Sequence, residues 1–287
     1  MSIFSIITPI YNGEKYIYDC YKSIINQSLD SWEWIVVDDG SKDNTKNILT
    51  EISNSDERVH FYSYKLNQGR GYARNYCIDK SSGRWIVIWD VDDISATNRL
   101  EELSKYTNHN YDYIYSTCVL ISREYKIYGL RGKNYSRLMR MEVPLHPSLC
   151  VSKDFFKFYR YSVYETCGGI GEDYSVLHTL GKYFRGLYIN EPLVYFFEDT
   201  EVNVRKAYDS NKAYFLDFMK FSMLCKSKNI FGFWSLLIKL TLFHILKIIP
   251  KSEKIYRYSI KFRKSDIIGN PEKEELFLRL QKILSRR

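Results

Sequence analysis

The chain has 287 residues and a mass of 34.2 kDa, enough for one large domain or for one domain with an appended module. Its hydrophobic fraction of 45% and charged fraction of 26% are typical of globular proteins and exclude a disordered chain. The net charge of +8 suggests an anionic partner, but residues 1–200 hold 23 Lys and Arg against 26 Asp and Glu, whereas residues 201–287 hold 19 against 8. The excess of basic residues belongs to the last third, which argues against a nucleic-acid-binding core.

The six cysteines are scattered, and no two of them form a Cys-x-x-Cys pair. We therefore expect no zinc site, and instead the reduced, mostly buried thiols of a cytosolic protein. The N-terminus has no basic region and leads directly into an apolar run, so we expect no signal peptide.

Short apolar runs alternate with helical patterns along the first part of the chain. We expect strands at residues 3–8, 34–37, 59–64 and 85–89, and helices at residues 14–28, 43–54 and 70–81. Strands that are apolar throughout and separated by helices indicate a parallel sheet covered by helices on both faces. Ligands of such sheets bind beyond the carboxyl ends of the strands.

The pattern is less regular further along the chain. Strands are expected at 113–121 and 188–197, and a helix at 173–182. The change in charge suggests a domain boundary near residue 200. This divides the chain into a catalytic domain, residues 1–200, with halves 1–103 and 104–200, and a C-terminal extension, residues 201–287.

Acidic residues follow two of the expected strands. Asp90 and Asp92 flank Val91, and alternate side chains of an extended segment share one face. Two close carboxylates suit a magnesium or manganese ion that fills its shell with water and diphosphate oxygens. A solvated acidic loop is the alternative. In the other segment, Asp38 can cap the next helix while Asp39 accepts a hydrogen bond from the ring N–H of a pyrimidine.

Together with their neighbours, these residues resemble the inverting family-2 glycosyltransferases, in particular bacterial surface-polysaccharide enzymes of the O-antigen and capsule type. The resemblance rests on residues 6–12, 14–17, 27–28, 34–41, 67–69, 73–75 and 83–93, and further on mainly on 171–173. It implies the GT-A nucleotide-diphospho-sugar transferase fold, a Rossmann-like, mostly parallel sheet with helices on both faces.

The resemblance also implies a UDP-sugar donor and assigns residues to its nucleoside. The side chains of Thr8, Pro9 and Tyr11 would line the uridine pocket, and Asp39 would bind the uracil.

For the rest of the donor, the resemblance implies that Asp90 lies near the ribose or base, beside Val91, and that Asp92 binds the Mn²⁺ or Mg²⁺ ion that bridges the diphosphate. Arg74 would either contact a phosphate or brace the acidic loops.

Inversion at the anomeric carbon needs a carboxylate that takes the proton of the acceptor hydroxyl. Glu172 and Asp173 lie in a glycine-rich loop that opens a helix. By resemblance Asp173 is the expected base and Glu172 the second candidate, whereas a helix N-terminal cap is the alternative role. His146 could contact the acceptor, although a lone histidine is more often structural.

The tail contains two amphipathic segments. Residues 229–250 carry Phe, Trp, Leu and Ile on one side and four basic or polar residues on the other, with lysines and arginines on both flanks. The four are Ser235, Lys239, His244 and Lys247. This pattern favours a helix lying on an anionic leaflet, so that 229–287 would bind a membrane surface. Packing against the catalytic domain or in a homodimer, and a true membrane span, are the alternatives. Residues 271–287 predict a last basic amphipathic helix.

The leading hypothesis is thus an inverting, metal-dependent enzyme at the cytoplasmic face of the bacterial inner membrane. It would move one sugar from a UDP-sugar to a polyprenyl-diphosphate oligosaccharide in cell-surface polysaccharide synthesis, without any nucleic-acid partner. A catalytically inert module of the same fold that gathers partners at the membrane is the alternative. A nucleotidyltransferase is a third reading, but the first strand lacks a glycine-rich, basic phosphate loop.

Overall fold

The computed structural model describes residues 3–132, 134–136, 141–163, 173–198 and 268–285, together with scattered residues between 208 and 245. The first half contains β1 (Phe4–Ile10), α1 (Ile17–Ile25), β2 (Trp32–Asp38), α2 (Thr45–Ser55), β3 (Val59–Ser63), α3 (Arg70–Lys80) and β4 (Trp85–Ile88). The alternation of strands and helices predicted for this half is confirmed, with bounds that differ by a few residues.

The second half is built from shorter and more varied elements. They are β5 (Ile94–Ser95), α4 (Arg99–Ser104), β6 (Tyr113–Ile121), β7 (Ile127–Arg131), β8 (Asn134–Ser136), β9 (Met141–Val143), the 3₁₀ helix η1 (His146–Ser148), β10 (Cys150–Ser152), the 3₁₀ helix η2 (Lys153–Lys157), α5 (Tyr174–Tyr183), β11 (Gly186–Phe197) and the C-terminal helix α9 (Asn270–Ser285).

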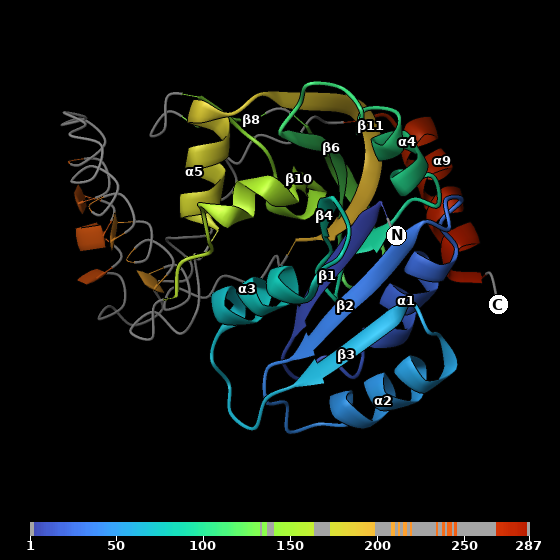
Figure 1. Ribbon diagram of the computed structural model, residues 1–287. Helices are drawn as coiled ribbons and strands as arrows, with labels where there is room; N and C mark the ends of the chain where they lie inside the picture. The colour runs from blue at the N-terminus through green and yellow to red at the C-terminus, as the bar shows by residue number, and fades with distance from the viewer. Residues whose placement is uncertain are drawn as a thin grey trace.

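One nine-stranded sheet organises the molecule, in the order β3-β2-β1-β4-β10-β6-β11-β5, with β7 paired to β6 (Figure 1). The strands β3, β2, β1 and β4 are parallel, as expected. The short strand β10 then lies antiparallel between β4 and β6, and β5 is antiparallel to β11. The sheet is therefore parallel in its first half and mixed in its second.

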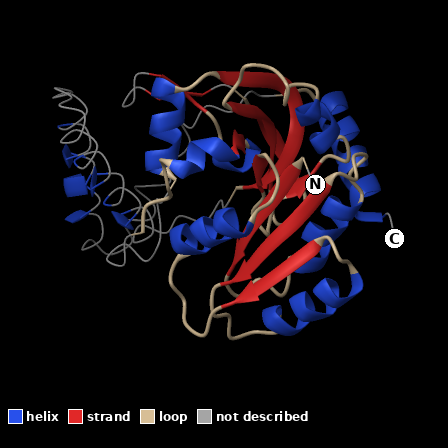
Figure 2. Cartoon of the chain, in the orientation of Figure 1, coloured by secondary structure: helices blue, strands red, loops and turns tan. Residues whose placement is uncertain are grey.

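Helices cover both faces of this sheet, as Figure 2 shows. Ile6 and Val36 belong to one core with residues of α1 and α2, whereas Ile7 and Val37 belong to a second core with residues of α3 and α5. Successive side chains of a strand point to opposite faces, so apolar runs without alternation are what a sheet buried on both sides requires. Each fully buried Ile or Val contributes about 1.5–3 kcal/mol.

The last helix differs from the expectation for the tail. We assigned it to a separate membrane-associating extension, but α9 packs against α1 and β7 of the catalytic domain. Its buried residues Leu276, Leu280 and Ile283 share a core with strands β6, β7 and β11, and the Tyr195 hydroxyl donates to the Leu276 carbonyl at 3.1 Å. The apolar stripe was predicted correctly, but a protein surface covers it.

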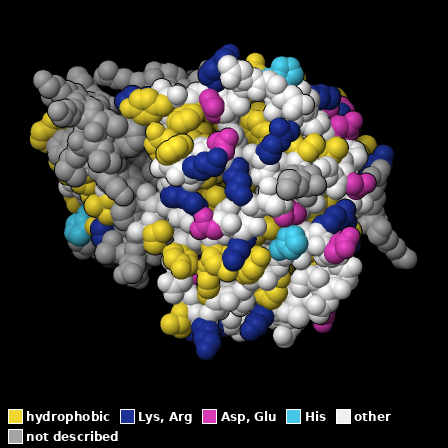
Figure 3. Space-filling view, viewed as in Figure 1, with side chains coloured by type: hydrophobic (Ala, Val, Ile, Leu, Met, Phe, Trp, Pro, Cys, Tyr) yellow, Lys and Arg dark blue, Asp and Glu magenta, His cyan; other side chains and the backbone are white. Residues whose placement is uncertain are grey.

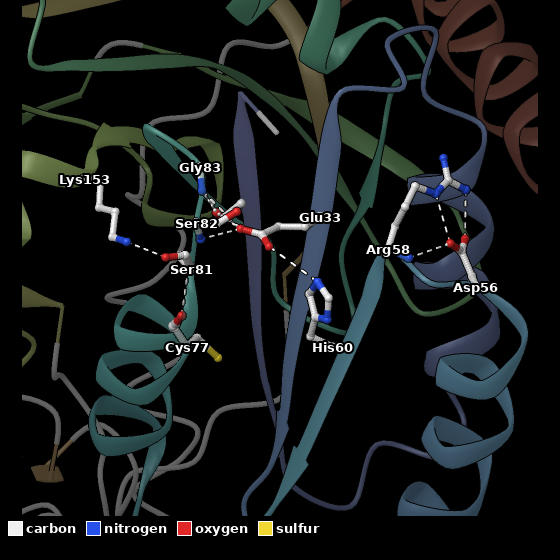
Figure 4. Close-up of polar contacts among 10 residues, drawn as sticks. Glu33, Asp56, Arg58, His60, Cys77, Ser81, Ser82, Gly83 and Lys153 are labelled. Carbon is white, nitrogen blue, oxygen red and sulfur yellow. Dashed lines mark hydrogen bonds and ion pairs between the residues drawn. The ribbon is translucent and has the colours of Figure 1, made fainter. Parts of the chain in front are cut away.

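A buried carboxylate joins the amino ends of the strands, the end opposite to the polar strand termini (Figure 4). Glu33, at the start of β2, accepts hydrogen bonds from the Ser5 hydroxyl (2.5 Å) and from the backbone N–H groups of Ser82 (2.5 Å) and Gly83 (3.1 Å). Burial alone would raise the pKa of Glu33, but these hydrogen bonds lower it below its usual range. The cluster links β1, β2 and the turn before β4.

Candidate functional site

The carboxyl ends of β2, β1 and β4 are neighbours in the sheet, so their polar ends form one rim (Figure 1). The expectation that Asp38–Asp39, residues 8–11 and residues 90–92 meet at one edge is therefore consistent with the strand order. The direction in which each side chain points depends on the loops that follow β1, β2 and β4.

Two loops of this rim, after β1 and after β2, are tied together by backbone-to-side-chain hydrogen bonds. The Asn12 N–H donates to Ser41 Oγ (2.8 Å), the Lys42 N–H donates to Asn12 Oδ1 (2.9 Å), and the Gly13 N–H donates to Thr45 Oγ1 (2.9 Å). Asn12 has a φ of 53°, in the left-handed region that Asn tolerates better than most residues. These bonds fix the two loops relative to each other.

Thr8 and Pro9 lie beneath the rim, in contrast to the expectation that they line a uridine pocket. Thr8 is fully buried, and its hydroxyl accepts a hydrogen bond from the Trp34 indole at 2.8 Å. Pro9 is buried as well. Both residues end a central strand packed on both faces, so their side chains support the rim from below. Tyr11, by contrast, is 45% exposed and stands at the surface of the rim.

Asp38 has a structural role, but it does not cap the next helix, because the N-cap of α2 is Asn44. Its carboxylate accepts hydrogen bonds from the Ser41 N–H (2.9 Å) and from the Ser63 hydroxyl (3.0 Å). The first is a local side-chain-to-backbone bond that shapes the loop leading from β2 toward α2.

Asp39 holds the loop that precedes α3. Its two oxygens accept hydrogen bonds from the backbone N–H groups of Gln68 (2.7 Å) and Gly69 (2.8 Å), and burial raises its pKa. Gly40 has a φ of 76°, and a Cβ there would lie 2.8 Å from the Asn67 nitrogen, so the close approach of the two loops requires glycine. A carboxylate has about four lone-pair sites, and two are occupied here, which leaves capacity for a further donor such as a pyrimidine ring N–H.

The acidic segment after β4 is a β-turn and not an extended strand. The Asp93 N–H donates to the Asp90 carbonyl at 3.0 Å, so the argument that alternate side chains share one face does not hold here. Asp90 pairs with Arg74 of α3 at 2.6 Å, whereas Asp92 pairs with Arg123 of the β6–β7 turn at 3.1 Å. The two carboxylates thus have partners from different elements.

The pKa values of the two carboxylates are shifted in opposite directions. Burial alone would raise the pKa of Asp90, but the Arg74 guanidinium holds it at about 2. Burial and the neighbouring Asp90 raise the pKa of Asp92, and Arg123 opposes them in part. Asp90 is therefore an anion bound to a fixed cation, which favours the bracing role for Arg74.

His146 has the structural role that we preferred for it. Its ring is buried, and its Nε2 lies 2.9 Å from the Tyr161 hydroxyl. Burial and the nearby Arg74 lower the pKa of His146 to about 3, so the ring is neutral. Asn75 pairs with both backbone groups of Tyr161 at 3.0 Å, which ties helix α3 to the segment ending at residue 163.

Asp173 occupies the N-cap position of α5 and makes no side-chain capping hydrogen bond there. Helix α5 packs on the same face of the sheet as α3, through Val176, Leu177 and Leu180. Glu172 lies outside the described residues.

No group of three or more His, Cys, Asp or Glu side chains with the arrangement of a metal site occurs in the described part of the chain. The rim nevertheless fits Mn²⁺ or Mg²⁺ held together with a diphosphate, because such ions need few protein carboxylates. Asp92 suits this role: its side chain is 34% exposed, and it lines a cavity of about 190 Å³ that also borders Val91.

Sequence reasoning missed Arg123, Tyr161 and Asn12. Arg123 is 31 residues from Asp92 in the chain, and no motif marks it. Asn12 could have been found, because Asn tolerates the left-handed conformation in turns better than most residues and Asn12 lies just after a predicted strand.

Several known glycosyltransferases resemble this chain in sequence. TuaG of Bacillus subtilis (strain 168), a putative teichuronic acid biosynthesis glycosyltransferase, is 40% identical over 98 residues, which are 34% of this chain and 39% of TuaG. WfgD of Escherichia coli, a UDP-Glc:alpha-D-GlcNAc-diphosphoundecaprenol beta-1,3-glucosyltransferase, is 35% identical over 119 residues, 41% of this chain and 46% of WfgD. The matched segments thus span less than half of each relative.

Two solved structures share the fold. Residues 1–349 of S. aureus TarS, in complex with UDP, superpose with a TM-score of 0.59 and 17% identity over 99% of this chain and 80% of that one. The mannosyltransferase PcManGT of Pyrobaculum calidifontis, in complex with GDP-Man and Mn²⁺, gives a TM-score of 0.57 and 13% identity over 98% and 85%. These likenesses confirm the GT-A type of fold. Residues 5–168, more than half of the chain, match the family described as glycosyl transferase family 2, and the chain therefore belongs to that family.

Proposed function

We propose that this chain is an inverting glycosyltransferase that moves a single sugar from a UDP-sugar to a lipid-linked oligosaccharide in cell-surface polysaccharide synthesis. The observation that carries the proposal is the rim of three neighbouring strand ends, with Asp39, Asp90 and Asp92 on it. Family membership and the names of relatives such as TuaG and WfgD support it.

On this proposal the rim binds the uridine diphosphate. Tyr11 contacts the base from the exposed side, and Asp39 accepts the N–H of the uracil ring. Asp90, kept anionic by Arg74, lies near the ribose. The preformed loops reduce the entropy lost on binding.

The reaction then needs one proton acceptor. Asp173 takes the proton of the acceptor hydroxyl, the acceptor oxygen bonds to the anomeric carbon, and the bond to the diphosphate oxygen breaks with its electron pair leaving on UDP. Attack from the face opposite to UDP inverts the configuration. Glu172 is the second candidate for the base.

Asp92 is the residue that would hold Mn²⁺ or Mg²⁺. When bound, the ion offsets the negative charge that develops on the leaving diphosphate. Asp39, Asp90 and the backbone of the two loops orient the donor for that displacement.

The test is UDP release from candidate sugar donors by the wild type and by Asp92→Asn and Asp173→Asn. We expect both variants to lose at least about 100-fold in kcat. Asp154→Asn is the matched control, because the Asp154 side chain is 78% exposed on η2. Full activity in both site variants would refute the proposal.

The inert module remains the second candidate function, because the paired acids also explain a nucleotide-binding site without turnover. UDP titration with and without Mn²⁺ separates the two. An enzyme of the proposed kind binds UDP more tightly with the ion, whereas an inert module has no need of that coupling.

The lipid-linked acceptor, a polyprenyl diphosphate, is proposed from the tail and from the printed names of the relatives. Trp234, Ile238, Leu242 and Ile245 are helical, and each is 49–64% exposed. Their spacing of three to four residues forms one apolar stripe on a helix. None of the helices in the described part of the chain has the length and apolar character needed to cross a bilayer.

We therefore propose a peripheral position at the cytoplasmic face of the inner membrane. Because α9 is packed on the catalytic domain, the contact with the anionic surface is narrowed from 229–287 to the stripe and the basic residues around it. On the face viewed in Figure 3, Lys and Arg are interspersed with Asp and Glu, which fits a catalytic domain that does not itself attract the membrane.

A further inference from the structure

The two acidic residues that flank Val91 have partners of different accessibility. Arg74, which pairs with Asp90, has only 2% of its side chain exposed. Arg123, which pairs with Asp92, is 37% exposed, and Asp92 itself is 34% exposed. The first pair is therefore fixed within the protein, whereas a ligand can reach and exchange the second.

Arg123 does not depend on Asp92 for its position. Its guanidinium lies over the rings of Tyr16 and Phe197, at 5.0 and 4.9 Å from their centroids. The turn that carries it is closed by mutual backbone bonding, with the Ser122 N–H donating to the Lys126 carbonyl at 2.9 Å. Cation–π contacts of this kind retain a guanidinium even when its anion leaves.

The cavity beside this pair contains a second cation. Lys15, just before α1, lines the same cavity of about 190 Å³ as Asp92 and Arg123, and so does Asp19, which accepts a hydrogen bond from the Tyr125 hydroxyl at 3.1 Å. A divalent cation that reaches Asp92 alone must displace Arg123, and the positive charges of Arg123 and Lys15 then remain beside it and repel it. A diphosphate that arrives with the ion cancels this repulsion.

We propose that Arg123 holds Asp92 in the free protein and thereby couples binding of the divalent cation to binding of the nucleoside diphosphate. Asp92 exchanges Arg123 for the ion when both ligands are present. Arg123 stays between its two rings and faces the diphosphate. It is a positioning residue of the donor site, and this inference rests on the proposed function.

The test measures free Mn²⁺ by electron paramagnetic resonance during titration of the full chain, with and without UDP. We expect Arg123→Gln to bind Mn²⁺ alone about threefold to tenfold more tightly than the wild type, because one repelling charge is gone. The gain in Mn²⁺ affinity caused by UDP should shrink, and by linkage the gain in UDP affinity caused by Mn²⁺ shrinks by the same factor.

Three further variants control the comparison. Arg123→Met removes the charge but keeps an apolar stem against both rings. It takes the place of Arg123→Gln if circular dichroism shows that the Arg123→Gln variant is unfolded. Arg123→Lys keeps the charge and should retain most of the coupling. Arg279→Gln removes an equal charge from an exposed pair on α9 and should change nothing.

Unchanged or weaker Mn²⁺ binding by the neutral variants would overturn the inference, and so would a lysine variant that behaves like the neutral ones. A wild type that couples Mn²⁺ to UDP together with variants that couple them equally would refute this inference alone. A wild type that binds neither ligand would refute the proposed function with it.

Discussion

Arg74 and Asp90 form an ion pair of 2.6 Å between helix α3 and the turn after β4, with the guanidinium buried. The Tyr161 ring lies 5.5 Å below the same guanidinium. One arginine thus connects the nucleotide-side helix, the acidic turn and the segment that leads toward α5.

The pair predicts strong energetic coupling. Arg74→Ala leaves Asp90 without its cation, and we expect it to lower the free energy of unfolding by about 3–5 kcal/mol. Asp90→Asn in the same background should cost much less than it does alone, since the unpaired charge is removed. Urea unfolding of both single variants and the double variant measures the coupling, and strictly additive losses would contradict the pair's role.

Asp39 should determine which pyrimidine nucleobase the site prefers. Uracil presents a ring N–H where cytosine presents an acceptor nitrogen, so a carboxylate favours UDP over CDP. In Asp39→Asn an amide N–H can face cytosine, and we expect the preference for UDP to fall at least about tenfold. Binding of both nucleotides by calorimetry tests this, because general damage to the 67–69 loop would weaken both and leave their ratio unchanged.

His146 predicts a loss of stability in mild acid. Its folded-state pKa of about 3 is depressed, so the unfolded chain takes up the proton first as the pH falls below the ordinary value of about 6.5. Stability is complete above that pH and declines toward pH 3, with a slope of up to about 1.4 kcal/mol per pH unit.

We expect His146→Gln, which can still bond to the Tyr161 hydroxyl, to show a flatter dependence between pH 6.5 and 4 than the wild type, by urea unfolding. His109→Gln is the control, since that histidine is exposed. Parallel curves for His146→Gln and the wild type would exclude His146 as the source.

The Glu33 cluster predicts a stability effect without an effect on the site. We expect Glu33→Gln to lower the free energy of unfolding at pH 7 by about 1–2 kcal/mol, because charge-assisted bonds become neutral ones. The folded-state pKa of Glu33 is depressed, so its contribution is present above the unfolded pKa of about 4.3 and is lost as the pH falls through the folded value.

The free energies of unfolding of the wild type and of Glu33→Gln should therefore converge in acid. The UDP affinity of Glu33→Gln at pH 7 should equal that of the wild type, since the cluster lies at the amino ends of the strands. Glu57→Gln, at an exposed position, provides the matched control. A loss of UDP binding in Glu33→Gln would show that the two ends of the sheet are coupled.

The apolar stripe predicts membrane binding. We expect Ile238→Glu with Leu242→Glu to reduce flotation with anionic vesicles several-fold, because both side chains are exposed and charge there opposes insertion. Leu278→Glu, at an equally exposed position of α9, is the control. Deleting the tail is a poorer experiment, since it also removes α9 from the core. Unchanged flotation would show that the stripe is not the anchor.

The sequence predicted correctly those features that depend on residues close together in the chain. Apolar runs such as 34–37 predicted strands because they are buried on both faces, and the structural role of Asp38 follows from its local bond to the Ser41 N–H. Prediction failed where distant segments meet. A strand is expected after residues 146–148, but nothing in Cys150–Ser152 indicates that it lies antiparallel between β4 and β6. Arg123 reaches Asp92 only because β6 and β5 flank the same strand, β11.

The same limit explains the last helix. A stripe of Leu276, Leu280 and Ile283 requires an apolar partner, but the pattern is identical for a lipid and for a protein surface. The prediction that Asp90 and Asp92 share one face was wrong for another reason. The alternation of side chains needs an extended backbone, and the hydrogen bond from the Asp93 N–H to the Asp90 carbonyl bends the segment.

The contact between α9 and α1 has a consequence for how the protein is made. Helix α1 leaves the ribosome early, whereas α9, which contacts it, is made only after every strand of the sheet. The core that α9 covers on β6, β7 and β11 therefore stays incomplete until residues 270–285 have been translated. Until then Ile121 and Tyr195 lack the apolar cover of Leu276, Leu280 and Ile283.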